Sequence, residues 1–90
     1  EGGIEGEIRG IWEELLGIEG IGEEESFFEL GGDSLLVIQL ISRLREAFKV
    51  EVQVSSLFDN PTIAGLAEHI DKLLIEEVEN LSEEEAVRLL

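Results

Sequence analysis

The sequence contains no cysteine. It can therefore form neither a disulfide framework nor a thiolate metal site, and it has no thiol of its own that could carry an acyl group. No stretch approaches the roughly 18 apolar residues that a membrane-spanning helix needs. The N-terminal residues lack the basic and apolar regions of a secretory signal peptide, so we expect a cytoplasmic protein or an excised part of one.

Basic residues are scarce as well. Six Lys and Arg stand against 22 Asp and Glu, and the formal net charge is −16. Such a charge excludes a nucleic-acid-binding function and repels anionic membranes. It either serves solubility alone or steers the protein toward partners with basic surfaces, and the two roles are compatible.

The chain has 90 residues, enough for one small domain with a modest core. Residues 1–7, rich in Gly and Glu, are expected to be a frayed linker end. Helical spacing of apolar residues predicts a first helix up to Gly17, a typical left-handed C-cap residue. A long loop over residues 18–33 follows, which we expect its own apolar side chains to anchor, namely Phe27, Phe28 and Leu30.

The second half of the chain is predicted to be helical too. An apolar-periodic run from Asp33 and Ser34, both good N-cap residues, to Phe48 predicts a second helix. Residues 50–54 alternate like a strand, but a lone strand has no partner, so we expect an extended connector. Residues 55–58 then suggest a short helical turn. Thr62 or Asn60 is expected to cap a last bundle helix whose buried face comprises Ile63, Leu66, Ala67, Ile70, Leu73 and Leu74.

Residues 79–90 are extra to this bundle. Ser82 and Glu85 have the spacing of a capping box, which predicts a separate short helix over Glu83–Leu90. We expect this tail to be a linker or docking segment, since a lone helix this short is marginal in water.

The segment Phe27–Leu36 (FFELGGDSLL) carries the chemistry. Ser34 stands at a helix start just after Gly31 and Gly32, which lack side chains that would crowd an approaching enzyme. The positive end of the helix dipole favours a phosphate there by about 0.3–1 kcal/mol. Two alternatives are a mere helix cap and a hydrolase nucleophile of the GDSL type. A hydrolase nucleophile needs a general base that a third group orients. The single histidine, His69, lies in the middle of a helix and has no such orienting group.

This segment resembles the phosphopantetheine attachment motif of carrier proteins, and is most similar to thiolation domains of nonribosomal peptide synthetases and modular polyketide synthases. The similarity extends to Ile11–Leu16, to Ser42–Phe48 and to Leu57–Ala67, and covers about residues 4–78. It implies an all-α, four-helix carrier bundle with a long first loop, a short third helix and a C-terminal extension over residues 79–90.

The resemblance also implies a function. A phosphopantetheinyl transferase would attach a 4′-phosphopantetheine arm from coenzyme A to Ser34, with Asp33 and Leu35 flanking the cofactor. The arm's thiol would hold an acyl, aminoacyl or peptidyl thioester, and the domain itself would not be an enzyme. Expected partners are the transferase and the adenylation or acyltransferase, condensation or ketosynthase, and thioesterase domains. We expect a monomer. The alternative is an acidic helical interaction module without a prosthetic group.

The second helix is predicted to have two faces. Five residues form one broad face and are expected to be core: Val37, Leu40, Ile41, Leu44 and Phe48. Four others follow helical spacing on another face and are expected to be exposed and to bind partners: Leu35, Ile38, Ser42 and Arg45. Trp12 is expected to be a core anchor.

Overall fold

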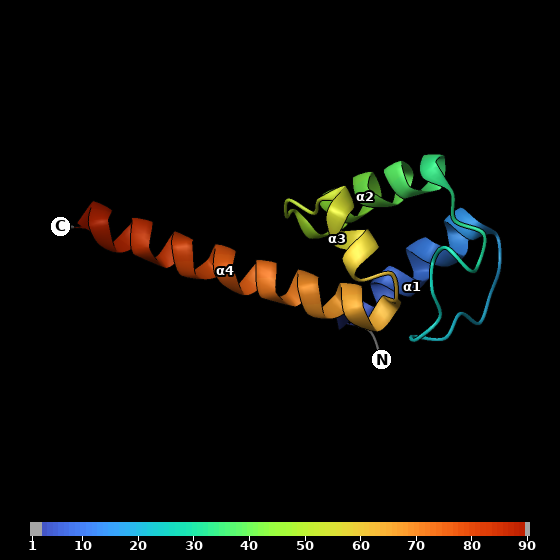
Figure 1. The fold of residues 1–90 in the computed structure, drawn as a ribbon. Coiled ribbons are helices and arrows are strands. Elements are labelled where there is room, and N and C mark those ends of the chain that lie inside the picture. Colours follow the sequence, from blue (N-terminus) through green and yellow to red (C-terminus); the bar gives the residue numbers. More distant parts are fainter. Residues whose placement is uncertain (1–2, 90) are drawn as a thin grey trace.

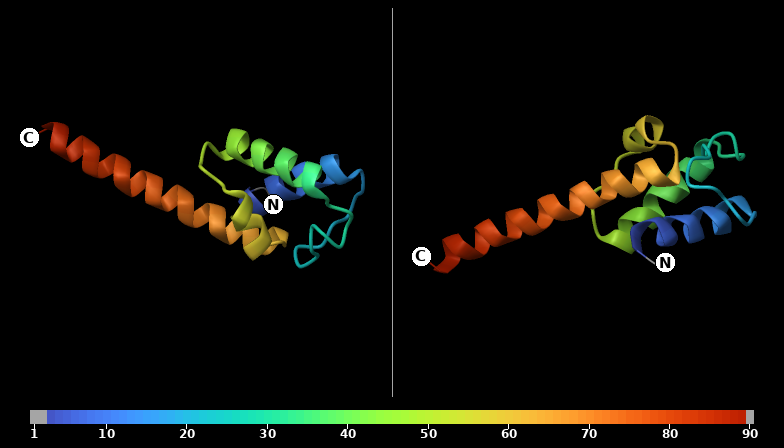
Figure 2. Two further views of the ribbon diagram at one scale, coloured as in Figure 1. Left: turned by 45° about the horizontal axis from the view of Figure 1, so that its top comes forward. Right: turned by 90° about the horizontal axis from the view of Figure 1, so that it is seen from below.

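The computed structural model describes the backbone of residues 3–89 and the side chains of residues 3–76. Within that part of the chain the protein is all-helical, with no named strand. The order is α1 (Gly3–Leu16), α2 (Ser34–Phe48), α3 (Val54–Asp59) and α4 (Ile63–Leu89) (Figure 1). The first three helices and the start of α4 form a bundle, and the C-terminal half of α4 extends away from it (Figures 1 and 2). The predicted fold class is confirmed.

Helix α1 begins earlier than the sequence suggests. It starts at Gly3, so the prediction of a frayed linker over residues 1–7 is wrong for residues 3–7. It ends as predicted, because Gly17 adopts a φ of +71° and its N–H donates to Glu13 O at 2.9 Å. This left-handed residue closes the helix.

The long loop between α1 and α2 is anchored both by packing and by backbone hydrogen bonds. Phe27 is completely buried, and Phe28 and Leu30 pack against the core, as predicted. Phe27 N–H donates to Pro61 O at 2.8 Å, and Ala64 N–H donates to Glu23 O at 3.0 Å. The loop is therefore tied to the segment that joins α3 to α4.

The connections around α3 match their predictions. Val50 and Val52 are buried in an extended connector that forms no strand. Thr62 Oγ1 accepts the N–H of Gly65 at 3.0 Å, so Thr62 caps α4. Asn60 instead donates its side-chain N–H to a carbonyl of α3.

Helix α4 is one continuous helix through Leu89, so the prediction that Ser82 begins a separate helix is wrong. No proline and no glycine follows Gly65 in this stretch, and an interior serine costs a helix only a few tenths of a kcal/mol. The helix propensity of these residues is thus sufficient for α4 to continue past Ser82 and Glu85. The side chains of Ser82 and Glu85 lie outside the described residues.

A single apolar core joins all four helices and the loop. Trp12 is fully buried, as predicted, and meets the edge of Phe27 with ring centroids 5.0 Å apart. The predicted core residues of α2 are buried, with Phe48 partly buried against them. The same holds for α4, where Leu73 and Leu74 are the partly buried members. Fully buried large side chains are Trp12, Phe27, Ile8, Leu40, Leu44, Leu57, Ile63, Leu66, Ile70 and Val52.

Candidate functional site

Ser34 is the first residue of α2 and is exposed. The helix is capped by Asp33, whose backbone is extended and whose Oδ1 accepts the N–H of Leu36 at 3.0 Å. Of the two predicted capping residues, Asp33 therefore does the capping. Among the side-chain hydrogen bonds of residues 3–76, none uses the Ser34 hydroxyl, so Oγ is free to react.

The start of α2 suits an anionic group. The first backbone N–H groups of a helix have no acceptor within it, and Asp33 satisfies only the one on Leu36. The N–H groups of Ser34 and Leu35 are therefore available near Oγ. The partial positive charge of the helix end adds about 0.3–1 kcal/mol for an exposed phosphate. These residues fit a phosphodiester on Ser34.

The two glycines before Asp33 have structural roles that the sequence did not reveal. Gly31 adopts a φ of +112°, which residues with a side chain rarely do. A Cβ on Gly32 would lie 2.4 Å from two ring carbons of Phe27 and 2.8 Å from its carbonyl oxygen. Gly32 N–H also donates to Phe27 O at 3.0 Å. The chain therefore enters α2 pressed against the Phe27 ring.

An aromatic row runs from the core to the surface beside this loop. Phe27 contacts Trp12 on one side and Phe28 on the other, both edge to face. Phe28 stacks on Phe58 of α3 with centroids 5.1 Å apart and planes 13° apart. Because Phe58 is 60% exposed, the row ends at the surface. It links the loop before Ser34 directly to α3.

The predicted outer face of α2 is exposed. Leu35 and Ile38 are 64% and 60% exposed, and Ser42 and Arg45 are exposed too. Arg45 is already engaged, since its Nε donates to Val52 O at 2.8 Å and its Nη2 lies 3.9 Å from Glu51. Its main contribution is thus to hold the connector.

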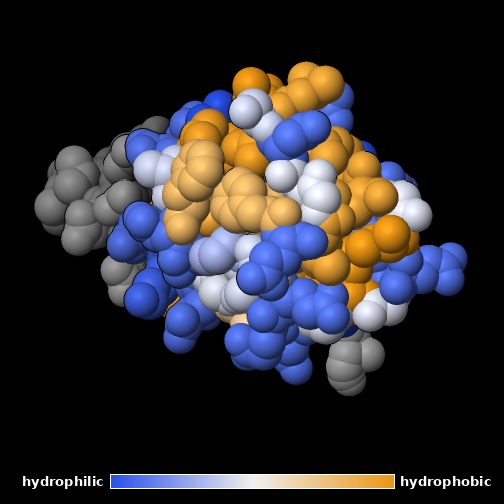
Figure 3. Space-filling view, turned by 45° about the vertical axis from the view of Figure 1, so that its right-hand side comes forward, coloured by the Kyte–Doolittle hydropathy of each residue, from blue (hydrophilic) through white to orange (hydrophobic). Residues whose placement is uncertain are grey.

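Helix α3 extends this apolar surface. Val54 and Phe58, which sequence reasoning did not identify, are exposed and one helical turn apart. A depression of about 230 Å³ lies between α2 and α3, lined by Ile38, Ile41, Ser42, Arg45 and Val54. Figure 3 shows hydrophobic side chains gathered on this side of the molecule among hydrophilic ones. The only sequence signal for this pair was the apolar i, i+4 spacing in a short helix.

Other activities find no support in the described residues. His69 is half-buried in α4, and no hydrogen bond within residues 3–76 joins it to Ser34, so the hydrolase alternative lacks its base. No cluster of His, Cys, Asp or Glu in the described part of the chain could hold a metal ion. None of the described helices is both long and apolar enough to cross a membrane.

Comparison with known proteins points to one family. Residues 6–70 match a family model described as "Phosphopantetheine attachment site". The chain is 51% identical over 61 residues to a dimodular nonribosomal peptide synthase of Bacillus subtilis. It is 44% identical over 75 residues to the phosphinothricin tripeptide synthetase PhsC of Streptomyces viridochromogenes. These matches cover 68% and 83% of this chain, but only 3% and 7% of the relatives' own length.

Solved structures agree in fold. A non-covalent docking-domain complex of the Pax peptide synthetase, PaxA T1-CDD with PaxB NDD, matches with a TM-score of 0.82 and 38% identity. That match covers 100% of this chain and 86% of the other. A peptidyl carrier protein in complex with coenzyme A and the transferase Sfp matches with a TM-score of 0.76 and 32% identity, over 80% of this chain and 94% of that one.

The packing of Gly32 generates a prediction. Gly32→Ala should lower the free energy of unfolding by about 1–3 kcal/mol, because the new methyl group overlaps the buried Phe27 ring. Gly10→Ala is the matched control, since nothing lies within 4 Å of its added Cβ in α1, and should gain up to about 1 kcal/mol. Urea denaturation measures both. Equal stability of Gly32→Ala and wild type would contradict this role of Phe27.

Proposed function

Since the chain belongs to the phosphopantetheine-attachment family, as a carrier domain of the nonribosomal peptide synthetase type, we propose that Ser34 carries its phosphopantetheine arm. The observation that supports this most is the free, exposed hydroxyl of Ser34 at the start of α2. Neighbouring Asp33 caps the helix, so Ser34 can be modified without loss of the cap. The family favours the carrier function over an acidic interaction module without a prosthetic group.

Several groups at the start of α2 would hold the phosphopantetheine arm. Ser34 Oγ would hold the phosphate as a phosphodiester, and the N–H groups at the helix start are the donors that a phosphate oxygen would meet. The bound arm supplies a terminal thiol that carries the intermediate as a thioester. The chain has no thiol of its own, so the arm is what would let it hold a thioester. In this proposal the domain presents cargo to the enzymes that act on it.

The cargo follows from the relatives. Both curated relatives described above are peptide synthetases, so an aminoacyl or peptidyl thioester is the proposed cargo. The proposed partners are a phosphopantetheinyl transferase and the adenylation, condensation and thioesterase domains of a synthetase. One similar carrier was solved with a transferase, and another is part of an adenylation–carrier structure with phenylalanyl-adenylate.

The outer face of α2 is proposed as the surface that these partners recognise. Leu35 and Ile38 expose apolar side chains within two turns of Ser34, and Ser42 lies farther along the same helix. Exposed apolar side chains beside a modification site favour protein contact. Arg45 borders this face, although its Nε is used by Val52 O.

Modification of Ser34 can be tested by intact mass. After incubation with coenzyme A and a transferase, the wild-type chain should gain the mass of one phosphopantetheine, and Ser34→Ala should gain none. The variant should lose less than about 0.5 kcal/mol of stability, because Asp33 provides the cap. A mass gain in Ser34→Ala, at Ser26, Ser55 or Ser56, would refute the assignment.

The recognition face can be tested with Ile38→Asp. The rate of loading by the transferase should fall several-fold, while the free energy of unfolding changes by less than about 1 kcal/mol, since the side chain is 60% exposed. Gln39→Asp, exposed on the next position, adds the same charge and should load at nearly the wild-type rate. A stability loss of about 2–5 kcal/mol for Ile38→Asp would instead mark Ile38 as a core residue.

We also propose that residues 4–78 form the carrier domain and residues 79–90 a linker or docking segment. The solved structure whose match spans the whole chain is a docking-domain complex of the Pax peptide synthetase, PaxA T1-CDD with PaxB NDD. The C-terminal half of α4 extends away from the other helices, which suits a segment that serves a neighbour (Figure 2).

Deletion of residues 80–90 tests this division. Loading of Ser34 should stay at the wild-type level, and the melting temperature should shift only slightly, because the buried core residues among the described side chains run from Ile8 to Ile70 and precede this segment. Amide hydrogen exchange supplies the second measurement. Protection across residues 83–89 as strong as in α2 would reveal a docked part of the bundle and contradict a linker.

A further inference from the structure

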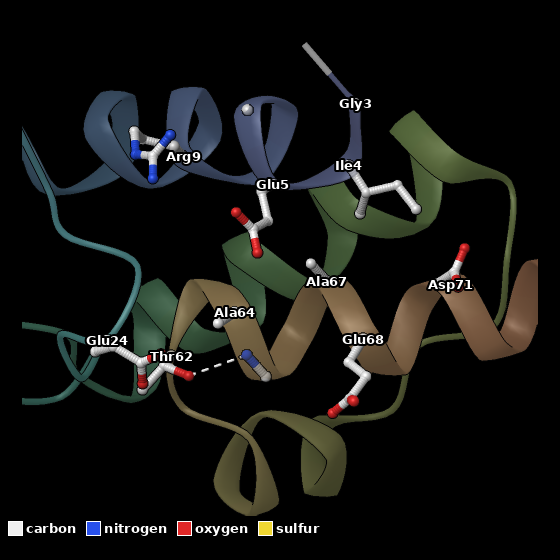
Figure 4. A pocket seen from close by; sticks show the side chains of 12 residues that line it. Gly3, Ile4, Glu5, Arg9, Glu24, Thr62, Ala64, Ala67, Glu68 and Asp71 are labelled. Atoms are coloured by element: carbon white, nitrogen blue, oxygen red, sulfur yellow. Dashed lines mark hydrogen bonds between the residues drawn. The ribbon is translucent and has the colours of Figure 1, made fainter. Parts of the chain in front are cut away.

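A groove lies on the side of the bundle built by α1 and α4. It is open, with a volume of about 1220 Å³, and the loop between α1 and α2 contributes Glu24 to its lining. Figure 4 shows Glu5 reaching from α1 toward the stretch of α4 that carries Ala64 and Ala67. Half of the lining residues are small or apolar: Gly3, Ile4, Gly6, Ala64, Gly65 and Ala67. Such residues leave room for another backbone to approach.

The charged residues that line the groove are mostly acidic. Four carboxylates are among them, namely Glu5, Glu24, Glu68 and Asp71. The single cation among the lining residues is Arg9, whose Nε–H already donates to Ile21 O at 3.0 Å. A carboxyl hydrogen bond with Glu23, and the negative charge of Glu23, raise the pKa of Glu5, while Arg9 opposes this only in part. The lining of the groove is therefore short of positive charge.

We propose that this groove binds a short basic segment of another polypeptide. Small apolar side chains of the segment would cover the small and apolar lining residues, and its Lys or Arg side chains would pair with the four lining carboxylates. A second copy of this chain, with its formal net charge of −16, would be repelled, as would nucleic acids and anionic lipids. The described residues also offer no metal-binding cluster.

The position of the groove gives it a distinct role. Ser34 and the exposed apolar residues lie on α2 and α3, whereas the groove belongs to α1, α4 and the loop. A segment bound in the groove therefore holds the carrier while Ser34 stays open to other partners. This inference concerns a different surface from the attachment site and holds whether or not Ser34 is modified.

Nuclear magnetic resonance titration tests the proposal. The probe is an amidated peptide of Ala, Leu and Lys, about 14 residues or roughly four helical turns long, added to the full chain at low ionic strength. The expected amide shifts concentrate on residues 3–9, 24 and 62–71. Glu5→Gln with Asp71→Asn should weaken binding about five-fold, from two lost surface ion pairs.

The control is a variant with the same net charge. Glu19→Gln with Glu46→Gln removes two exposed carboxylates away from the groove and should weaken binding less than about two-fold. Ser34→Ala should bind the peptide like wild type, and melting curves confirm that each variant is folded. Four outcomes would overturn the proposal: no binding, shifts spread evenly over the surface, equal weakening in the two double variants, or groove shifts that grow with protein concentration in the absence of peptide.

Discussion

The burial of Phe27 is the contact on which the proposed attachment site at Ser34 depends. Its ring packs against the backbone of Gly32 and against Trp12. Its main chain forms hydrogen bonds with Pro61 and Gly32. A long loop loses conformational entropy when it is ordered, about 1–2 kcal/mol per residue, and the burial of a large aromatic ring offsets part of that cost. The buried Phe27 ring thus fixes the position of the loop that leads to the exposed Ser34.

The helix cap and the proposed attachment point are adjacent residues. If Ser34 were itself the cap, attachment of a phosphate to its hydroxyl would remove the acceptor that holds the first turn. Asp33 accepts the N–H of Leu36, so α2 keeps its start whatever is attached to Ser34. A domain this small builds one modest core. The proposed functions accordingly lie on two surfaces: the apolar one of α2 and α3, and the groove of α1 and α4.

Much of this could be predicted because the signals are local. Helical periodicity identified the buried stripes of α2 and α4, and the resemblance over residues 4–78 pointed to the family from residue types and spacing alone. The errors came where one local signal competed with another. Glycines near Gly3 suggested a frayed end, and Ser82 suggested a new helix, yet α1 begins at Gly3 and α4 runs through Ser82. A cap residue begins a helix only where the preceding backbone has left the helical conformation.

The sequence by itself determined the all-helical class, the carrier family and the serine that the motif singles out, since each depends on residue type and spacing along the chain. Only the tertiary structure decided why Gly32 must be glycine, that Phe58 continues the aromatic row from Phe28, and that Glu5 shares a groove with Asp71. Folding brings these residues together although some of them, such as Glu5 and Asp71, lie near opposite ends of the domain in the sequence. Sequence spacing carries no information about contacts of that kind, because they depend on how the helices pack and not on the period within any one of them.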